Sequence, residues 1–297
     1  EIFDQLHFVH HDSTEEKAMT SLGFTSRGTE IKIRKDILKS TLIITYGAIS
    51  HHYFAGYGGG RKLLFPGLAE KTAIYQNHNL FLDKKTKTLE KDCQPGNLNG
   101  NPIADDLKEI DDVLPSKISI HGLLNSQGKV CDFMFGKNHD DFLRACEVYD
   151  DYFRSGAGQV FDLVIASSGG APKDINFIQS HKSMHNAAAF VKDGGTLILL
   201  AECQDGIGND KFLPLFKESD WNSIFDKLAK KYEGNGGTAL ATMAKTARIN
   251  VKIFTALDKP TCDLLHVEKL GKKELENELK TSNGDVAAIF NASMLVK

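Results

Sequence analysis

Apolar residues along the chain fall into two kinds of segment that alternate. Short runs rich in β-branched residues predict buried strands, at residues 40–46, 117–124, 160–166, 196–201, 251–255 and 286–289. Longer segments with apolar residues at helical spacing predict helices, at residues 69–82, 105–113, 139–154, 177–192, 221–232 and 238–246. Because strands and helices take turns along the chain, the pattern predicts an α/β fold with mainly parallel sheets.

A patch of small residues at 155–158 predicts a boundary between two domains. We expect an N-terminal, cofactor-binding domain over residues 1–155 and a C-terminal α/β domain over residues 156–297. Ligands of parallel sheets bind where loops leave the carboxyl ends of strands. The loops at 47–62 and 167–182 have that position, so we expect the active site in the cleft between the two α/β domains.

The composition excludes several classes of protein. Charged residues make up 25% of the chain and the net charge is −3, whereas a protein that binds nucleic acid or an anionic membrane carries a basic surplus. No apolar run approaches the roughly 18 residues of a membrane span, and the first residues do not form a signal peptide. The five cysteines include no Cys-x-x-Cys pair, so neither a zinc ribbon nor a disulfide framework is indicated. We expect a cytoplasmic protein with reduced thiols.

A glycine-dense segment at 51–62 leaves a predicted strand and enters a predicted helix. Its backbone N–H groups are suited to an anion, and Arg61 and Lys62 add positive charge. The pattern is not a P-loop, because Leu63 stands where a hydroxyl residue would bind magnesium. It is not a dinucleotide fingerprint either, because Arg61 replaces the third glycine.

Two histidines, His52 and His78, flank this segment. A neutral imidazole is both a common ligand of transition metals and an acid or base near neutral pH. A lysine such as Lys62 can form a covalent link to a bound molecule. A single histidine is nevertheless more often structural than a ligand, and the residues alone indicate only an anion-binding loop beside two histidines.

The same segment resembles the nickel-dependent lactate racemase family. The similar stretches around it are residues 50–52, 55–60, 61–67, 72–74 and 77–78. Further stretches resemble the family along most of the chain, at residues 10–12, 22–23, 28–29, 100–106, 168–182, 194–195 and 201–208.

The resemblance implies an isomerase that carries a nickel-pincer nucleotide, in which a pyridinium ring holds nickel through two sulfurs and a ring carbon. Lys62 matches the lysine that attaches this cofactor, and His78 matches the histidine that ligates nickel. His52 matches one of two acid/base histidines. The resemblance also assigns cofactor binding to the loop glycines Gly58, Gly59 and Gly60.

The reaction implied is racemisation or epimerisation of a 2-hydroxy acid by a hydride relay through a transient 2-oxo acid. Gln179 and Lys182 match the pair that binds the substrate, and their i, i+3 spacing puts both on one face of a helix. Lys182 would bind the carboxylate and Gln179 would hydrogen-bond the substrate. The cofactor implies partner enzymes that synthesise it.

The sequence departs from the family in two ways. We find neither the Asp-x-x-Arg stretch whose arginine clamps the substrate nor the Gly-Thr-His-Arg motif with the second acid/base histidine. Since the first residue is Glu1 rather than Met, we expect an incomplete N-terminal domain and a chain that does not racemise on its own. Ile178 stands where lactate-specific members carry a tyrosine that lines the pocket, which favours a substrate other than lactate.

Two other functions stay open at this point. One is a non-catalytic module of the same fold that binds a nucleotide or phosphate at residues 56–62. The other is a phosphate-binding α/β transferase, which the absence of a general catalytic dyad disfavours.

Overall fold

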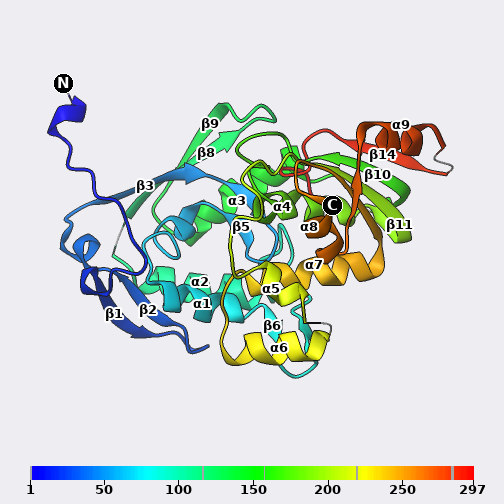
Figure 1. The fold of residues 1–297 in the computed structure, drawn as a ribbon. Helices are drawn as coiled ribbons and strands as arrows, with labels where there is room; N and C mark the ends of the chain where they lie inside the picture. The colour runs from blue at the N-terminus through cyan, green and yellow to red at the C-terminus, as the bar shows by residue number, and fades with distance from the viewer. Residues whose placement is uncertain (1, 116, 157, 219, 282–283) are drawn as a thin grey trace.

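The computed structural model describes residues 2–115, 117–156, 158–218, 220–281 and 284–297. Glu1, and Ala157 of the predicted domain boundary, lie outside these residues. Figure 1 shows a larger sheet with its helices on the right and a smaller sheet, formed by the first half of the chain, on the left. In the described part of the chain, no helix is long and apolar enough to cross a membrane.

The second half of the chain forms a five-stranded sheet in which every pair of neighbours is parallel. Its order is β13 (Glu268–Leu270), β12 (Asn250–Phe254), β11 (Val191–Leu200), β10 (Phe161–Ser167) and β14 (Val286–Ile289). The helices of this half are α4 (Phe177–Ala188), α5 (Leu213–Phe216), α6 (Trp221–Lys230), α7 (Gly236–Arg248), α8 (Lys259–Leu264) and α9 (Lys272–Thr281).

Both faces of this sheet are buried, which explains why its strands are continuous apolar runs in the sequence. On one face Val164 and Leu197 belong to a core that includes Met184 of α4. On the other face Leu163 and Ile198 pack with Leu270, and Leu275 of α9 lies against them. The α/β fold and the parallel sheet predicted for this half are confirmed.

The first half of the chain has a small mixed sheet, so the expectation of mainly parallel sheets is wrong for this half. Its order is β3 (Ile43–Ala48), β8 (Lys117–Leu124) and β9 (Val130–Gly136), with β3 parallel and β9 antiparallel to β8. The Asn125 side chain accepts hydrogen bonds from the N–H groups of Gln127 and Lys129 and thereby closes a tight turn. A tight turn between consecutive strands makes them antiparallel.

Shorter elements complete the first half. Three hairpins pair β1 (Met19–Phe24) with β2 (Glu30–Arg34), β4 (Ser50–His52) with β5 (Gly56–Gly58), and β6 (Leu82–Asp83) with β7 (Thr88–Leu89). The α-helices are α1 (Lys71–Asn79), α2 (Pro102–Val113) and α3 (His139–Phe153). The 3₁₀ turns are η1 (Ile2–Gln5), η2 (Glu16–Ala18), η3 (Lys35–Lys39) and η4 (Gly60–Leu63).

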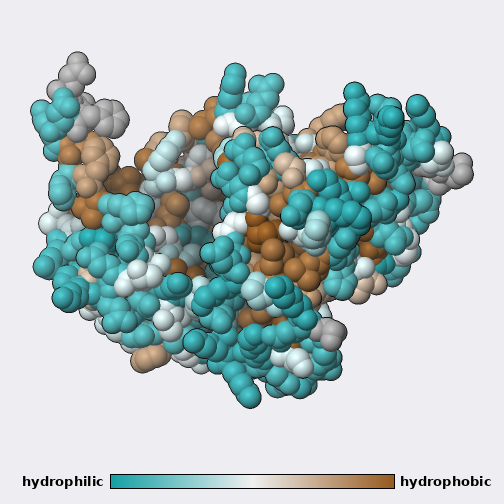
Figure 2. Space-filling model, in the orientation of Figure 1, coloured by the Kyte–Doolittle hydropathy of each residue, from teal (hydrophilic) through white to brown (hydrophobic). Residues whose placement is uncertain are grey.

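The mixed sheet has polar residues on its buried face and apolar residues on its exposed face. Thr45 and Ser119 are buried and their hydroxyls are 3.0 Å apart. Ile44, Tyr46 and Phe135, which point the other way, are each more than half exposed. Part of this apolar surface is visible in the upper left of Figure 2.

The two halves share packing, and the boundary at 155/156 stays a prediction. Leu82 of the first half belongs to the core of the large sheet, and Ala241 of α7 belongs to the core of the first half. Near the end of the chain, Val296 returns to form a β-bridge with Arg154.

The helix predicted at 177–192 is shorter in the structure. The N–H of Phe190 bonds the carbonyl of Ala187 in a tight last turn, and β11 begins at Val191. The paired glycines at 194–195, which resemble the family's motif, lie inside β11.

Candidate active site

The glycine-rich segment folds as a small hairpin followed by a helical turn. In the hairpin β4 pairs antiparallel with β5 and His52 lies opposite Gly56, and η4 begins at Gly60. The sequence predicted a loop between a strand and a helix. Three-residue strands are too short to show an apolar period, so this hairpin left no signal in the sequence.

The predicted cofactor-binding glycines Gly58, Gly59 and Gly60 are packed closely against the protein. A Cβ atom on Gly59 would overlap the carbonyl of Ala48, and one on Gly60 would overlap the ring of Phe142. Gly59 and Gly60 also have positive φ angles of 75° and 53°. Packing and backbone conformation therefore require glycine at 59 and 60, and contact of these three residues with a cofactor stays a prediction.

Three predicted site residues, His52, Lys62 and His78, gather around the ring of Phe54. The centroid of the His52 ring lies 4.5 Å from that of Phe54, edge to face, and the centroid of His78 lies 5.0 Å away. The Lys62 ammonium lies 5.9 Å from the centre of the same ring. The ring of Tyr53 stacks on the ring of His52, with the two centroids 5.3 Å apart.

Burial makes the neutral forms of these three groups favourable. It lowers the pKa of Lys62 to about 7, with added repulsion from Lys182 and Arg61. It lowers the pKa of His78 to about 3, and the positive charge of Lys62 contributes. Burial and then Lys62 and Lys182 hold the pKa of His52 well below its ordinary value. A neutral imidazole can bind a metal or accept a proton, and a neutral amine is a nucleophile.

The orientation of the His52 ring is set by its own hairpin turn. The N–H of Ala55 lies 3.3 Å from Nδ1 of His52 and donates to it when that nitrogen is unprotonated. In the described part of the chain, no hydrogen bond engages Nε2 of His52. This nitrogen is therefore available to a substrate.

Gln179 and Lys182 lie on the first turns of α4. The side chain of Asn176 caps the helix by accepting the N–H of Gln179 at 3.0 Å. The Lys182 ammonium donates to Oε1 of Gln179 at 2.7 Å. Lys182 keeps an exposed surface, but enough protein surrounds its ammonium for burial to lower its pKa. The predicted pair therefore forms one hydrogen-bonded unit.

A cavity of about 250 Å³ is shared by His52 and the pair Gln179 and Lys182. It is lined by Ala48, Ile49, Ser50, His51, His52, Leu124, Tyr149, Lys173, Gln179, Lys182, Ser293 and Met294. His52 thus faces the same space as Gln179 and Lys182. Lys62 and His78 are not among the lining residues and lie beside Phe54.

The second histidine on the cavity, His51, is already engaged. Its Nε2 lies 2.7 Å from the carboxylate of Asp150, and its Nδ1 lies 3.2 Å from the carbonyl of Met294. His181 and His185 lie against Tyr53, with ring centroids 5.3 and 5.5 Å from that of Tyr53. None of these three was predicted as a site residue.

Ile178 does not line this cavity. It is partly buried against the core of the large sheet. Two residues that the sequence did not single out, Lys173 and Tyr149, do line it. Lys173 belongs to the loop that follows β10, and the position of that loop at the carboxyl end of a strand was the one available signal.

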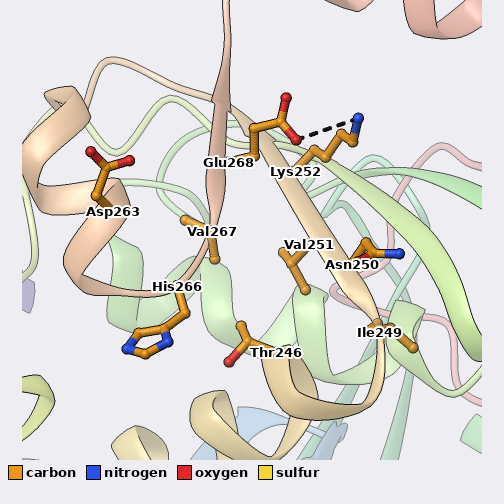
Figure 3. Close-up of a pocket in the computed structure, with 9 residues that line it drawn as sticks. All are labelled: Thr246, Ile249, Asn250, Val251, Lys252, Asp263, His266, Val267 and Glu268. Atoms are coloured by element: carbon orange, nitrogen blue, oxygen red, sulfur yellow. Dashed lines mark ion pairs between the residues drawn. The ribbon is translucent and has the colours of Figure 1, made fainter. Parts of the chain in front are cut away.

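A second hollow lies far from these residues, on the large sheet (Figure 3). Its volume is about 330 Å³, and it is bordered by Asn250 at the start of β12 and Glu268 at the start of β13. Lys252 and Glu268 form an ion pair of 3.4 Å at its edge. Because it is at the amino ends of parallel strands, it is not in the usual position of a ligand site.

Comparison with protein-family models gives two matches. The model described as "Lactate racemase N-terminal domain" matches residues 1–90, and the one described as "Lactate racemase C-terminal domain" matches residues 157–256. Together these models match more than half of the chain. These matches do not test the expectation of an incomplete N-terminal domain, which stays a prediction.

Two curated relatives are lactate racemases. The one from Thermoanaerobacterium thermosaccharolyticum is 32% identical over 225 residues, which are 75% of this chain and 51% of the relative. The one from Lactiplantibacillus plantarum is 30% identical over 212 residues, 71% of this chain and 49% of the relative. The matched region thus spans about half the length of these relatives.

Two solved structures resemble the fold. The lactate racemase apoprotein from T. thermosaccharolyticum superimposes with a TM-score of 0.86 and 26% identity, over 100% of this chain and 72% of its own. A protein from Thermotoga maritima superimposes with a TM-score of 0.71 and 13% identity, over 97% of this chain and 77% of its own. The second likeness concerns the fold alone.

Proposed function

Because the chain belongs to the lactate racemase family, we propose that it is a racemase or epimerase of a 2-hydroxy acid and carries a nickel-pincer nucleotide on Lys62. The observation that carries the proposal is the convergence of His52, Lys62 and His78 on the ring of Phe54.

The donor groups of the site fit such a cofactor. A pincer brings three donors of its own to nickel and requires one from the protein, and the neutral imidazole of His78 would be that ligand. The neutral amine of Lys62 would be the point of attachment. Among the described residues no three His, Cys, Asp or Glu side chains gather into a metal site. A cofactor that takes a single ligand from the protein does not require such a group.

When bound, the nucleotide supplies reversible uptake of the substrate's α-hydrogen as hydride. The protein supplies the proton chemistry. His52 would take the proton of the substrate hydroxyl, since burial keeps its imidazole unprotonated at neutral pH. Its stacking on Tyr53 and the contact from Ala55 hold the ring in place.

Lys182 and Gln179 would hold the substrate. The Lys182 ammonium would bind the carboxylate beside the hydroxyl-bearing carbon as a point charge. The carbonyl oxygen of Gln179 accepts from Lys182, so its amide NH₂ group is left to donate to a substrate oxygen. This pair lines the cavity from the second half of the chain, whereas His52 lines it from the first half.

A racemase needs an acid/base group on each side of its substrate, because two enantiomers present their hydroxyls to opposite sides. Of the two histidines on the cavity, His51 has both ring nitrogens engaged. Among the described residues that line the cavity, His52 is thus the histidine with a free ring nitrogen, so the opposite side of the substrate would need a different acid/base group.

The test is an assay of the chain after co-production with cofactor-making enzymes, started separately from the D and the L form of a 2-hydroxy acid. We expect conversion in the unaltered chain, which would overturn the expectation from its sequence that it does not racemise on its own, and a loss of about 10²-fold or more in His52→Gln. Conversion at equal rates by both proteins would refute the role of His52. No conversion of any 2-hydroxy acid by fully loaded protein would refute the proposed function.

A further inference from the structure

The cavity beside His52 is lined by two lysines and by no acidic residue. One of the lysines, Lys182, is already assigned to the substrate carboxylate and shares its charge with Gln179. The carboxylate of Asp150, behind the lining residue His51, is directed to His51 and Arg154. The cavity therefore carries more positive charge than one carboxylate would neutralise.

The second lysine, Lys173, has no partner for its charge. It is half-buried, and its ammonium makes no hydrogen bond or ion pair with any described residue. Burial lowers its pKa, and no neighbouring charge contributes to that shift. Two other lysines of low exposure are paired with acids, Lys117 with Asp111 at 2.7 Å and Lys252 with Glu278 at 2.6 Å. A half-buried ammonium without a counter-ion on a cavity wall is suited to an anionic ligand.

Hydroxyl groups add to the polar character of this wall. Ser50, Tyr149 and Ser293 line the cavity together with Lys173. The Tyr149 hydroxyl is fully buried and has no hydrogen-bond partner among the described residues. The Ser293 hydroxyl already donates to Oδ1 of Asn291. The methyl group of a three-carbon acid would leave the Tyr149 hydroxyl unsatisfied, whereas a ligand with a polar far end would satisfy it.

We infer that the site takes a 2-hydroxy acid with a second carboxylate, which Lys173 binds while Lys182 binds the carboxylate next to the hydroxyl-bearing carbon. This inference rests on the proposed function, since it takes the reacting end of the substrate from it. Lys173 is then the residue that determines specificity. The rival source of negative charge is the phosphate of the tethered nucleotide, and the test separates the two.

The experiment is isothermal titration of the nickel-free chain with malate, lactate and nicotinic acid mononucleotide. We expect malate to bind at least tenfold more tightly than lactate, because it adds a charge-assisted hydrogen bond. Lys173→Gln should weaken malate about tenfold and leave lactate within twofold. Lys173→Arg keeps the charge and should keep malate binding. Lys273→Gln, on an exposed lysine of α9 that pairs with no residue in the described part of the chain, is the control and should change neither.

Several results would overturn the inference. In the unaltered chain they are equal affinity for the two acids or no binding of either acid. In Lys173→Gln they are equal weakening of the binding of both acids, or weaker binding of the mononucleotide with malate binding unchanged. Circular dichroism checks whether Lys173→Gln keeps its secondary structure. If it does not, Lys173→Arg decides, and loss of malate binding in a folded Lys173→Arg would overturn the inference. In the loaded protein, turnover of lactate without malate would refute the inference and leave the proposed function standing. Turnover of another 2-hydroxy acid but not of malate would also refute the inference, and turnover of no 2-hydroxy acid at all would refute the proposed function itself.

Discussion

The ammonium of Lys182 lies 2.7 Å from Oε1 of Gln179, one turn earlier on α4. The bond occupies the acceptor end of the Gln179 amide and holds the long lysine side chain at the cavity wall. A lysine held in place loses less side-chain entropy when it binds a carboxylate. Gln179 is thus a positioning residue for Lys182 as well as a donor to the substrate.

Removing either member of this pair should weaken binding of a 2-hydroxy acid. We expect Gln179→Ala to raise the dissociation constant roughly tenfold and Lys182→Ala to raise it roughly a hundredfold, since the lysine carries the charge. Titration calorimetry on the nickel-free protein measures both. If the two residues are coupled, Gln179→Ala should change the dissociation constant less when Lys182 is already alanine. An equal change in both backgrounds would contradict the coupling.

The Lys62 amine should react at a lower pH than an ordinary lysine. Its pKa is lowered to about 7 by burial and by the charges of Lys182 and Arg61. With a small acylating reagent, the modification of Lys62 should rise with pH and reach half its maximum near pH 7. Mass spectrometry of the Lys62 peptide follows it, and exposed Lys273 reports how the reagent itself responds to pH. Lys182→Gln should move the midpoint to higher pH. A midpoint above pH 9 in the unaltered chain, with no change in Lys182→Gln, would count against the predicted environment of Lys62.

Gly60→Ala should destabilise the protein through two effects. The residue has φ +53°, and an added Cβ atom would overlap the Phe142 ring. Gly128 separates these effects, because it has φ +76° with nothing near its Cβ position. We expect Gly128→Ala to lower the free energy of unfolding by about 1 kcal/mol and Gly60→Ala by about 3 kcal/mol, as chemical denaturation measures. Equal losses at the two positions would show that the contact with Phe142 is unimportant.

Lys245 on α7 should make stability depend on pH. Burial lowers its pKa from 10.5 to about 7, and its ammonium donates to the carbonyl of Ala241 at 2.9 Å. Between pH 7 and 10.5 the unfolded chain binds this proton and the folded chain does not, so this group makes stability rise with pH in that window. Lys245→Met should therefore stabilise the protein by about 2 kcal/mol at pH 7 and progressively less toward pH 10. Denaturation at several pH values, with Lys273→Met as control, tests it, and a benefit that grows with pH would refute it.

The sequence predicted the large sheet better than the small one, for a physical reason. Strands such as β10 and β11 are buried on both faces and appear as long apolar runs. In β9, by contrast, Phe133 and Phe135 are exposed, and an apolar alternation on an uncovered face does not indicate which side is buried. The hairpin of β4 and β5 is too short to show a period.

The site was only partly predictable for a similar reason. The family resemblance singled out His52, Lys62 and His78, but nothing in their spacing indicates that Phe54 brings them together. Lys173 carries no motif, and its role depends on the absence of a partner, which only three-dimensional contacts reveal.

The central claim is that Lys62 carries the nucleotide and His78 binds its nickel. The most direct test is to produce the chain with cofactor-making enzymes and to measure the mass of the Lys62 peptide and the nickel content. We predict an added mass on Lys62 with about one nickel per chain, no added mass in Lys62→Arg, and an added mass with little nickel in His78→Ala. An unmodified Lys62 and no nickel, while the lactate racemase of T. thermosaccharolyticum made in the same cells is loaded, would contradict the account.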